Sequence, residues 1–403
     1  MRFGFFNLLF LKIIFDQLRN IENMPIDFTK IPSPCYLLDE SLLRRNLEII
    51  RRVRDAADVE IIMAFKGFAM WSVFPIVREY ISGATASSAF EARLAVDEMK
   101  SLAHTYAPGY RDYDFAEIMK NSSHITFNSL TQLKRFLPDV KKFERPISVG
   151  LRVNPEYSEV GTALYNPCSP GSRLGVMADV VGDTLPEGVD GLHFHTLCES
   201  SSFDLENTLA AFEKRFGHLI PKVKWINMGG GHLMTRKGYD TEHLIRLLKD
   251  FKKRYNVHVI LEPGAVFAWE TGYLVSTVED LVENKGIRTA ILDVSFTGHM
   301  PDCLEMPYKP RIIGSYFEPV AGKPTYRMGG NSCLSGDFMG DWSFDAELKV
   351  GDKIVFEDMI HYTMVKTTFF NGVQHPSIGV WTAKDEFKLI RQFGYEDYKN
   401  KLS

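Results

Sequence analysis

Between residues 58 and 264, short apolar runs alternate with amphipathic segments, and no other feature of the chain constrains its fold as strongly. The runs predict eight strands, which read VEIIMAF, GATASS, AHTYAP, HITFNS, ISVGLRV, VDGLHFH, VKWINM and VHVILEP. Helical patterns lie between several of them. In TEHLIRLLKDFKKRY, for example, leucines and a phenylalanine recur at i, i+3, i+4 and i+7 and form one apolar face. Strands and helices in this number and order predict a parallel (β/α)8 barrel.

A doubly wound dinucleotide-binding sheet is the main alternative fold. That fold needs a Gly-x-Gly-x-x-Gly turn directly after its first strand. The chain has KGFAMWS at this place, so the glycine fingerprint is missing. We therefore expect residues 46–264 to form the barrel.

The alternation of strands and helices ends after residue 264. Short strands with turn residues between them, such as RTAILDVSF and DKIVFEDM, predict a mostly β domain over residues 265–403. The strand-like SPCYLLDE within residues 24–45 is expected to join that domain. Residues 1–23 carry an apolar run that Lys12 interrupts, and they lack a small-residue cleavage site. We interpret them as an extension outside the fold, with the working chain beginning near Met24.

Charge and cysteine content narrow the class of partner. Lysines and arginines number 47 against 51 acidic residues, a net charge of −4, which gives no electrostatic reason to expect nucleic acid or an anionic membrane. The five cysteines show no close-paired spacing, which indicates free thiols in a reducing cytoplasm rather than disulfides or a zinc site. A cytoplasmic protein that acts on a small molecule, without a metal, is the expectation.

Reactive residue types recur where the predicted strands end. Active sites of parallel barrels are built at this carboxyl-terminal face. The first strand ends in Lys66, the fifth in Arg152, the sixth in His195, the seventh in glycines 229–231 and the eighth in Glu262. Because five strands end in this way, we expect these residues to share one site.

Each of these residue types suits a particular chemistry. A lysine desolvated at the mouth of an apolar barrel has a lowered amine pKa and is a competent nucleophile toward an aldehyde. Bare glycine amides can cradle a phosphate, and a buried Glu262 could keep a pyridine nitrogen protonated. The structural alternatives are a Lys66 whose head reaches water and a glycine triplet that only makes a tight turn. His193 and His195 alternate along one strand, so we expect only His195 to face the barrel centre and His193 to be a packed histidine.

The β domain adds further candidates. The glycine-rich loop MGGNSCLSGD contains Cys333 and Asp337, and HYTMVKTTFFNG contains Tyr362, whose hydroxyl could reach a phosphate. HMPDCLEMPY places Asp302 and Glu305 just after a strand. A buried cysteine in a turn and solvated loop charges are the structural alternatives.

Together these stretches resemble fold-type III pyridoxal-phosphate decarboxylases, the group of ornithine, arginine and diaminopimelate decarboxylases, which have an alanine-racemase-like barrel and a C-terminal β domain. The resemblance runs from about residue 28 to the C-terminus. Within the group the chain is most similar to carboxynorspermidine (carboxyspermidine) decarboxylases, through SPCYLLDE, AFKGFAMWSVFP, GLHFHTLCE, NMGGGHLMTR, HMPDCLEMPY and GGNSCLSGD.

The resemblance implies a role for each candidate. Lys66 would bind pyridoxal 5'-phosphate covalently, and Cys333 would reach the cofactor from a partner subunit, near protonation of the carbanion. His195 would stack on the cofactor ring and Glu262 would pair with its pyridine nitrogen, whereas the phosphate would be held by Gly230, Gly231 and Tyr362. Arg152, Asp302 and Asp337 would serve the substrate side of the site, together with Glu262. A homodimer with shared active sites follows from the role of Cys333.

The activity that the resemblance implies is decarboxylation of carboxynorspermidine, carboxyspermidine or both, to norspermidine and spermidine in polyamine biosynthesis. A decarboxylase of ornithine or diaminopimelate is the alternative enzyme, and a non-catalytic carrier of the cofactor is the alternative of another class. Those two decarboxylases usually have arginine after Glu-Pro-Gly, where this chain has Ala265. The missing charge argues against diaminopimelate, because its second carboxylate needs cationic partners.

Overall fold

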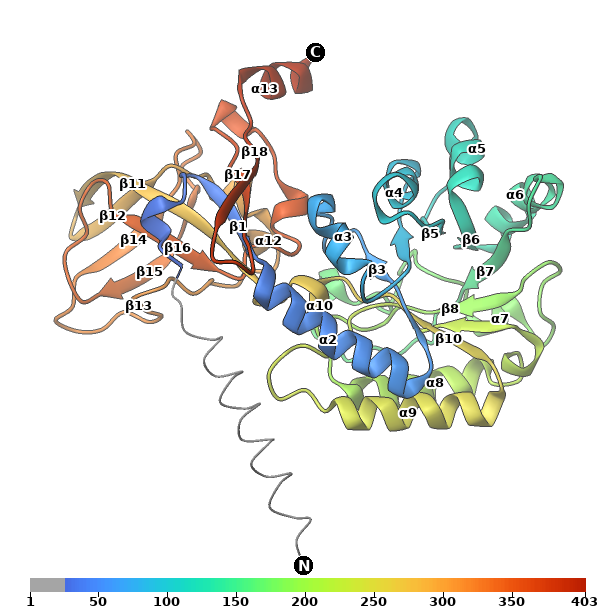
Figure 1. Cartoon of the computed structure of the whole chain (residues 1–403). Helices are drawn as coiled ribbons and strands as arrows, with labels where there is room; N and C mark the ends of the chain where they lie inside the picture. The colour runs from blue at the N-terminus through green and yellow to red at the C-terminus, as the bar shows by residue number, and fades with distance from the viewer. Residues whose placement is uncertain (1–25) are drawn as a thin grey trace, which may run out of the picture.

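Nine short strand segments, all parallel to their neighbours, close into a barrel in the computed structural model, which describes residues 26–403 (Figure 1). The segments are β2 (Glu60–Ile61), β3 (Met63–Ala64), β4 (Ala84–Ala86), β5 (Ala103–Tyr106), β6 (Ser122–Phe127), β7 (Ser148–Arg152), β8 (Gly191–His193), β9 (Trp225–Asn227) and β10 (His258–Leu261). The first predicted strand is split at Ile62: β2 pairs with β10 and β3 pairs with β4. The two halves of this strand therefore close the sheet, and the predicted (β/α)8 barrel is confirmed.

The inner face of the barrel holds a tryptophan against two glycines. Gly150, Gly191 and Trp225 are register neighbours on β7, β8 and β9, so they point to the same side of the sheet. The next residues along β8 and β9, Leu192 and Ile226, belong to the core packed under the helices. A Cβ added to Gly191 would lie 2.0 Å from the Trp225 ring, so only glycine leaves room for this side chain.

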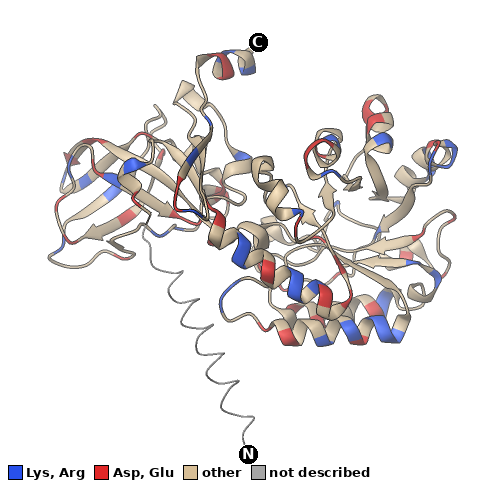
Figure 2. Cartoon of the chain, in the orientation of Figure 1, with Lys and Arg blue, Asp and Glu red and all other residues tan. Residues whose placement is uncertain are grey.

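Helices surround the barrel: α2 (Glu40–Ala57), α3 (Phe74–Val77), α4 (Ala89–Leu94), α5 (Asp112–Asn121), α6 (Leu130–Lys142), α7 (Ala178–Val181), α8 (Ser202–Phe216) and α9 (Thr241–Tyr255). A π-helical turn at Ala95–Met99 extends α4. The apolar face predicted for α9 is buried, with Leu244, Leu248 and Phe251 in the core and Leu247 only half-buried. Figure 2 shows positions of charged residues recurring along α2 and α9.

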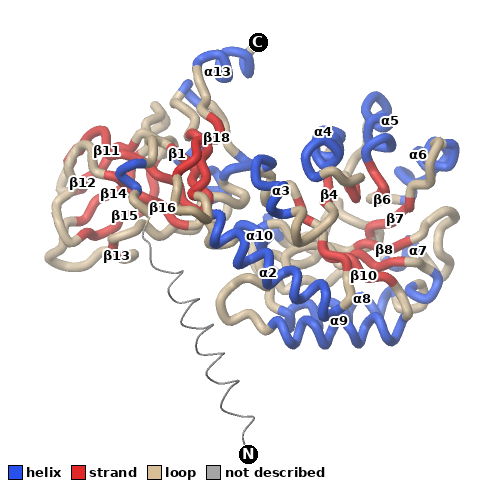
Figure 3. The backbone as a smooth tube through the Cα atoms, in the orientation of Figure 1, coloured by secondary structure: helices blue, strands red, loops and turns tan. Residues whose placement is uncertain are grey.

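The second part of the chain is a mostly β domain (Figure 3). Its strands are β1 (Cys35–Asp39), β11 (Gly272–Asn284), β12 (Ile287–Leu292), β13 (Ser315–Tyr316), β14 (Thr325–Gly329), β15 (Phe338–Phe344), β16 (Lys353–Glu357), β17 (Ser377–Trp381) and β18 (Phe387–Arg391). They form one sheet in the order β13-β15-β14-β12-β11-β1-β17-β18, and β16 pairs with β11. Short helices accompany them: α10 (Ala265–Ala268), α11 (Phe296–His299), α12 (Pro301–Glu305) and α13 (Tyr395–Leu402).

The N-terminal strand β1 belongs to this sheet, between β11 and β17, before the chain enters the barrel through α2. The predicted extension 1–23 and the predicted start near Met24 lie outside the described residues. Within residues 26–403, no helix combines the length and the apolar character needed to cross a bilayer.

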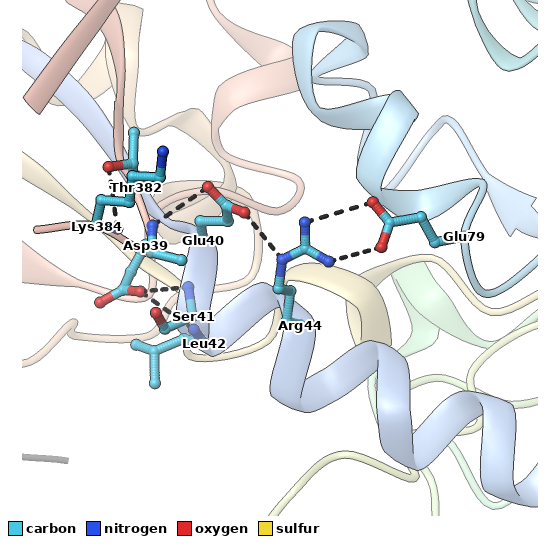
Figure 4. Close-up of polar contacts among 9 residues, drawn as sticks. Asp39, Glu40, Ser41, Leu42, Arg44, Glu79, Thr382 and Lys384 are labelled. Atoms are coloured by element: carbon cyan, nitrogen blue, oxygen red, sulfur yellow. Dashed lines mark hydrogen bonds and ion pairs between the residues drawn. The ribbon is translucent and has the colours of Figure 1, made fainter. Parts of the chain in front are cut away.

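One helix start ties the two parts together (Figure 4). The Asp39 carboxylate caps α2 by accepting from the backbone N–H groups of Ser41 and Leu42. Arg44 donates from Nε to Glu40, at 2.9 Å, and from Nη1 to Glu79 beyond α3, at 2.8 Å. Glu40 also accepts from the turn between β17 and β18. The start of α2 therefore contacts both the sheet domain and the barrel.

Candidate active site

The carboxyl ends of the barrel strands surround two adjoining cavities of about 560 and 750 Å³. Both are lined by Lys66, Tyr165, His195, Gly230 and Glu262, and together we call them the Lys66 cavity. Three of these residues come from the ends of β3, β9 and β10, and His195 follows β8. The barrel topology alone brings together residues that are up to about 200 positions apart in the chain.

Lys66 and His195 contact each other in this cavity. Nζ of Lys66 lies 3.3 Å from Nε2 of His195, and Nδ1 of His195 accepts a 2.9 Å hydrogen bond from the backbone N–H of Gly230. A neutral His195 that accepts at Nδ1 carries its proton on Nε2. Only an unprotonated Lys66 amine could accept that proton in a hydrogen bond, so the contact favours neutral lysine.

Electrostatics act in the same direction. Lys66 is open to the cavity but surrounded by protein atoms, and this burial, reinforced by the nearby charge of Arg152, lowers the pKa of its amine. Burial also lowers the pKa of His195 well below its ordinary value, and the charge of Lys66 adds to the effect. The Lys66 amine is therefore more available as a nucleophile than an exposed lysine.

Glu262, which directly follows β10, is held as a carboxylate. Its Oε1 accepts a 2.6 Å hydrogen bond from Nδ2 of Asn227, and its Oε2 lies 3.5 Å from Nε2 of His193. Burial acts to raise the pKa of the Glu262 carboxyl. The contacts with His193 and Asn227, and the charge of His104, outweigh it and bring the pKa to about 2. A cationic group that entered the cavity would therefore meet an anionic Glu262.

The prediction for His193 was wrong. His193 lines the same cavity as His195, with its side chain 3 % exposed, and it faces Glu262 instead of packing against the helices. The alternation argument failed because side chains two positions apart on a strand point to the same side, and Gly191, two residues before His193, already lies on the inner face. The ring of His193 also packs against Tyr106, with centroids 5.4 Å apart.

The glycine triplet follows β9 and makes a close turn. A Cβ on Gly230 would lie 2.4 Å from the carbonyl oxygen of Glu262, and one on Gly231 would lie 2.3 Å from Leu197. The amide of Gly230 already donates to His195, as described above, and that of Gly229 donates to Oδ1 of Asn227 at 2.9 Å. The triplet therefore orients His195 and Asn227 besides lining the cavity.

Arg152 lines the smaller of the two cavities and Tyr362 lines the larger. Arg152, the last residue of β7, donates to the carbonyl of His195 at 3.2 Å and lies over the ring of Tyr106 at 4.7 Å. Tyr362 lines the larger cavity, and its backbone N–H donates to Gly67 at 2.8 Å. Burial raises the pKa of the Tyr362 hydroxyl, which therefore stays protonated and able to donate.

The acidic residues of the β domain separate into two groups. Asp302, on α12, lines the larger cavity and accepts a 2.7 Å hydrogen bond from Lys366, which also contacts Glu305 at 2.6 Å. Asp337 lies elsewhere: its buried carboxylate accepts from the backbone N–H groups of Thr297 and Ser332, both at 3.1 Å.

Cys333 is exposed, and its backbone N–H donates to Oδ1 of Asn371 at 3.0 Å. Neither Cys333 nor Asp337 lines the Lys66 cavity that residues 26–403 of one chain form. Their predicted roles remain predictions, and for Cys333 that role belongs to the site of a partner subunit.

Sequence reasoning missed three residues that line or support the cavity. Asn227 ends β9 just before the glycine triplet, so a search for polar residues at strand ends would have found it. His193 ends β8 in the same way. Glu199 is part of the GLHFHTLCE stretch, but it lies in a loop that follows β8, and no pattern in the sequence indicates where its side chain points.

The residues present fit pyridoxal phosphate. An aldehyde needs a neutral amine, which Lys66 offers, and a pyridine nitrogen needs an anionic acceptor, which Glu262 offers. The donors for a phosphate are the Tyr362 hydroxyl and the turn at Gly231, where a Cβ would overlap the backbone of Leu197. A parallel barrel with this lysine, this carboxylate and a C-terminal β domain defines a pyridoxal-phosphate enzyme of the fold-type III class.

Comparison with protein families identifies the chain further. Residues 35–360 match the family described as "Pyridoxal-dependent decarboxylase, C-terminal sheet domain". This match covers more than half of the chain, so the chain belongs to the pyridoxal-dependent decarboxylases. The predicted enzyme class and the predicted cofactor are confirmed.

Two relatives and one solved structure are similar over nearly the whole chain. Carboxyaminopropylagmatine decarboxylase of Synechocystis sp. is 52 % identical over 93 % of this chain and 96 % of its own length. Carboxynorspermidine/carboxyspermidine decarboxylase of Campylobacter jejuni is 42 % identical over 92 % of this chain and 98 % of its own. The crystal structure of carboxynorspermidine decarboxylase from Campylobacter jejuni, complexed with norspermidine, superposes with a TM-score of 0.85 at 41 % identity, over 92 % of this chain and all of that one.

Proposed function

We propose that the chain decarboxylates carboxynorspermidine, carboxyspermidine or a polyamine with the same head group, in polyamine biosynthesis. The observation that carries the proposal is the Lys66 cavity, lined by an amine of lowered pKa, an anionic Glu262 and the further carboxylates of Glu199 and Asp302, in a chain similar throughout to decarboxylases of such compounds. The carboxylated polyamines named by these relatives share a carboxyaminopropyl group on an amine. They differ in the part of the molecule beyond that amine.

Pyridoxal phosphate, when bound, supplies an electron sink for the bond that the departing carboxylate breaks. The protein's own residues prepare the site for it. The Lys66 amine would react with the aldehyde of the cofactor, and the Glu262 carboxylate would keep the pyridine nitrogen protonated. Arg152 fixes the loop that carries His195 through its hydrogen bond to the His195 carbonyl. We propose that His195 covers one face of the cofactor ring and that Tyr362 and Gly231 bind the phosphate.

The test is a substrate panel on purified holoenzyme. Carbon dioxide release is measured with carboxynorspermidine, carboxyspermidine, carboxyaminopropylagmatine, ornithine and diaminopimelate, and kcat/KM is compared. A carboxylated polyamine should exceed ornithine and diaminopimelate by at least about a hundredfold, because sites built for polar groups reject substrates that leave those groups unpaired. Lys66→Ala should abolish both turnover and the cofactor's absorption near the visible edge. Equal or higher kcat/KM on ornithine or diaminopimelate would refute the proposal, and bound cofactor without any turnover would favour a carrier.

A second candidate substrate has a specific observation in its favour. The relative at 52 % identity is a carboxyaminopropylagmatine decarboxylase, whereas the carboxynorspermidine/carboxyspermidine decarboxylase of Campylobacter jejuni is 42 % identical. Agmatine ends in a guanidinium group in place of an ammonium group, so the two candidates differ in the cation at the far end of the substrate. The same panel separates them.

We further propose a homodimer in which the Cys333 loop of one subunit completes the site of the other, together with a cytoplasmic location. The exposed position of Cys333, outside its own chain's cavity, supports the first proposal. All five cysteines are free, which supports the second. We also propose that Asp302 contacts a substrate amine from its place in the larger cavity, and that Asp337 contributes to the substrate side from its loop.

A further inference from the structure

A third cavity of about 950 Å³ continues from the Lys66 cavity toward the β domain. The two are lined in common by Glu199, Asp302 and Met306. Beyond these residues the third cavity is lined by Trp269 and Glu270, which follow α10, and by parts of β11 and β16, so it lies where the barrel meets the sheet domain. We call it the junction chamber. A substrate anchored at Lys66 could extend past Glu199 and Asp302 into this chamber.

The two shared carboxylates differ in what they already bind. Asp302 is paired with Lys366 at 2.7 Å, so much of its charge is neutralised. The Glu199 carboxylate makes no hydrogen bond or ion pair with any of residues 26–403, and the contact at this position is between the Glu199 backbone carbonyl and Arg236. Burial raises the pKa of Glu199, with the positive charge of His361 opposing that rise. Glu199 is exposed to solvent in these cavities, and a cavity-lining carboxylate without a cation is a position that a cationic ligand would stabilise.

The rest of the junction chamber suits an elongated cation. Its lining includes the aromatic side chains of Trp269 and Tyr308, over which ammonium and guanidinium groups pack favourably. The charged groups in the lining are the carboxylates Glu199, Glu270, Asp302, Glu357 and Asp358 and the basic residues Lys237, Lys309, Arg311 and His361. Two of the basic groups are engaged: His361 contacts Asp358 at 3.1 Å, and Lys309 donates to the carbonyls of Phe317 and Asp341. With the Asp302–Lys366 and Asp358–His361 pairs set aside, the carboxylates Glu199, Glu270 and Glu357 and the cations Lys237, Lys309 and Arg311 remain, and Glu199 is the one of these carboxylates that also lines the Lys66 cavity.

We propose that Glu199 binds the cationic tail of the substrate and that the junction chamber receives the tail's distal ammonium or guanidinium group. The inference rests on the proposed function and names the residue and the space that would distinguish a polyamine from a short amino acid. The first tail nitrogen would donate to the Glu199 carboxylate as the chain passes out of the Lys66 cavity. The distal group would then lie against Trp269 among the remaining carboxylates.

The test compares tailed and tailless ligands. Glu199→Gln keeps the shape of the side chain and removes its charge. In the holoenzyme it should raise KM for carboxynorspermidine and for carboxyaminopropylagmatine roughly ten- to hundredfold, the value of a hydrogen bond to a charged group. It should change kcat/KM less than about twofold for 2-aminobutyrate, which has the reacting head without any tail nitrogen. Glu187→Gln, which removes an exposed carboxylate paired with Lys141 on the barrel surface, is the matched control and should change neither.

A binding measurement separates this inference from the proposed function. Calorimetric titration of wild-type and Glu199→Gln holoenzyme with norspermidine, and then with aminopropylagmatine, requires no turnover. A tenfold or greater loss of affinity in the variant supports the tail site, and the ligand that loses more identifies the preferred distal group. Unchanged affinity for both, or an equal loss for 2-aminobutyrate, overturns it. Absence of carbon dioxide release from every carboxylated polyamine would refute the proposed function, while the titration would still decide the role of Glu199.

Discussion

Asn227 donates a hydrogen bond from Nδ2 to Oε1 of Glu262, at 2.6 Å, at the junction of β9 and the loop that follows β10. The same amide accepts at Oδ1 from the backbone N–H of Gly229. One buried side chain therefore aims the carboxylate and fixes the glycine turn. Because the other carboxylate oxygen faces His193, the orientation of Glu262 is determined from two strands.

Asn227→Ala should weaken cofactor binding roughly tenfold or more, because Glu262 loses a hydrogen bond to its charged form and the turn at Gly229 loses its acceptor. Titration of the apoenzyme with pyridoxal phosphate, followed by absorbance, measures the effect. The control is Asn121→Ala, which removes another buried asparagine that donates to a glutamate, Glu117, on α5. An unchanged dissociation constant in the Asn227 variant would contradict the role given to this side chain.

The fold was predictable because it depends on a pattern that is local in sequence. Apolar runs of strand length alternate with helical periods, and a parallel barrel is the fold that this order produces. The residues at strand ends, Lys66 and Glu262 above all, could be found for the same reason, since a position along a strand specifies its height in the barrel.

The remaining features depend on contacts that no pattern displays. Asp337 looked like a free acid in a glycine-rich loop, but its carboxylate accepts hydrogen bonds from backbone N–H groups, one of them about forty residues away in the chain. The error at His193 was of another kind, because residues two positions apart on a strand share a face and the alternation therefore places His193 beside His195. The position of Glu199 depends on how two domains meet.

Replacement of Lys66 should change the pH dependence of stability in the apoenzyme. The folded state lowers the pKa of this amine below its unfolded value of about 10.4, so the unfolded chain binds more protons between the two values and wild-type stability rises with pH in that interval. Lys66→Met removes the cost of burying the ammonium. The variant should be more stable than wild type at pH 7, and its advantage should shrink as the pH approaches 10.4.

Urea denaturation of both apoproteins at several pH values measures this difference. Lys249→Met, on the exposed side of α9, shows what the loss of a surface lysine does under the same conditions. A Lys66→Met advantage that grew with pH would have the wrong sign and would contradict a lowered pKa.

Gly191→Ala should destabilise the barrel by about 1–3 kcal/mol or more, because the added methyl group overlaps the buried Trp225 ring and neither strand can move apart without breaking its ladder. The midpoint of urea unfolding measures the loss. Gly109→Ala is the matched control, since a Cβ there meets no atom within 4 Å. Equal midpoints for the two variants would show that Trp225 has room to shift.

Mixed dimers test whether the two chains share their sites. Lys66→Ala and Cys333→Ala homodimers should each have little activity. If Cys333 acts on the neighbouring subunit's cavity, a mixed dimer contains one site with both native residues and one site with neither. Random reassociation should then restore roughly a quarter of wild-type activity, because half of the dimers are mixed and each has one working site. Carbon dioxide release after joint unfolding and refolding measures it, with sedimentation to establish that dimers form. Activity no higher than the sum of the two homodimers would place Lys66 and Cys333 in the same chain's site, which the exposed position of Cys333 argues against.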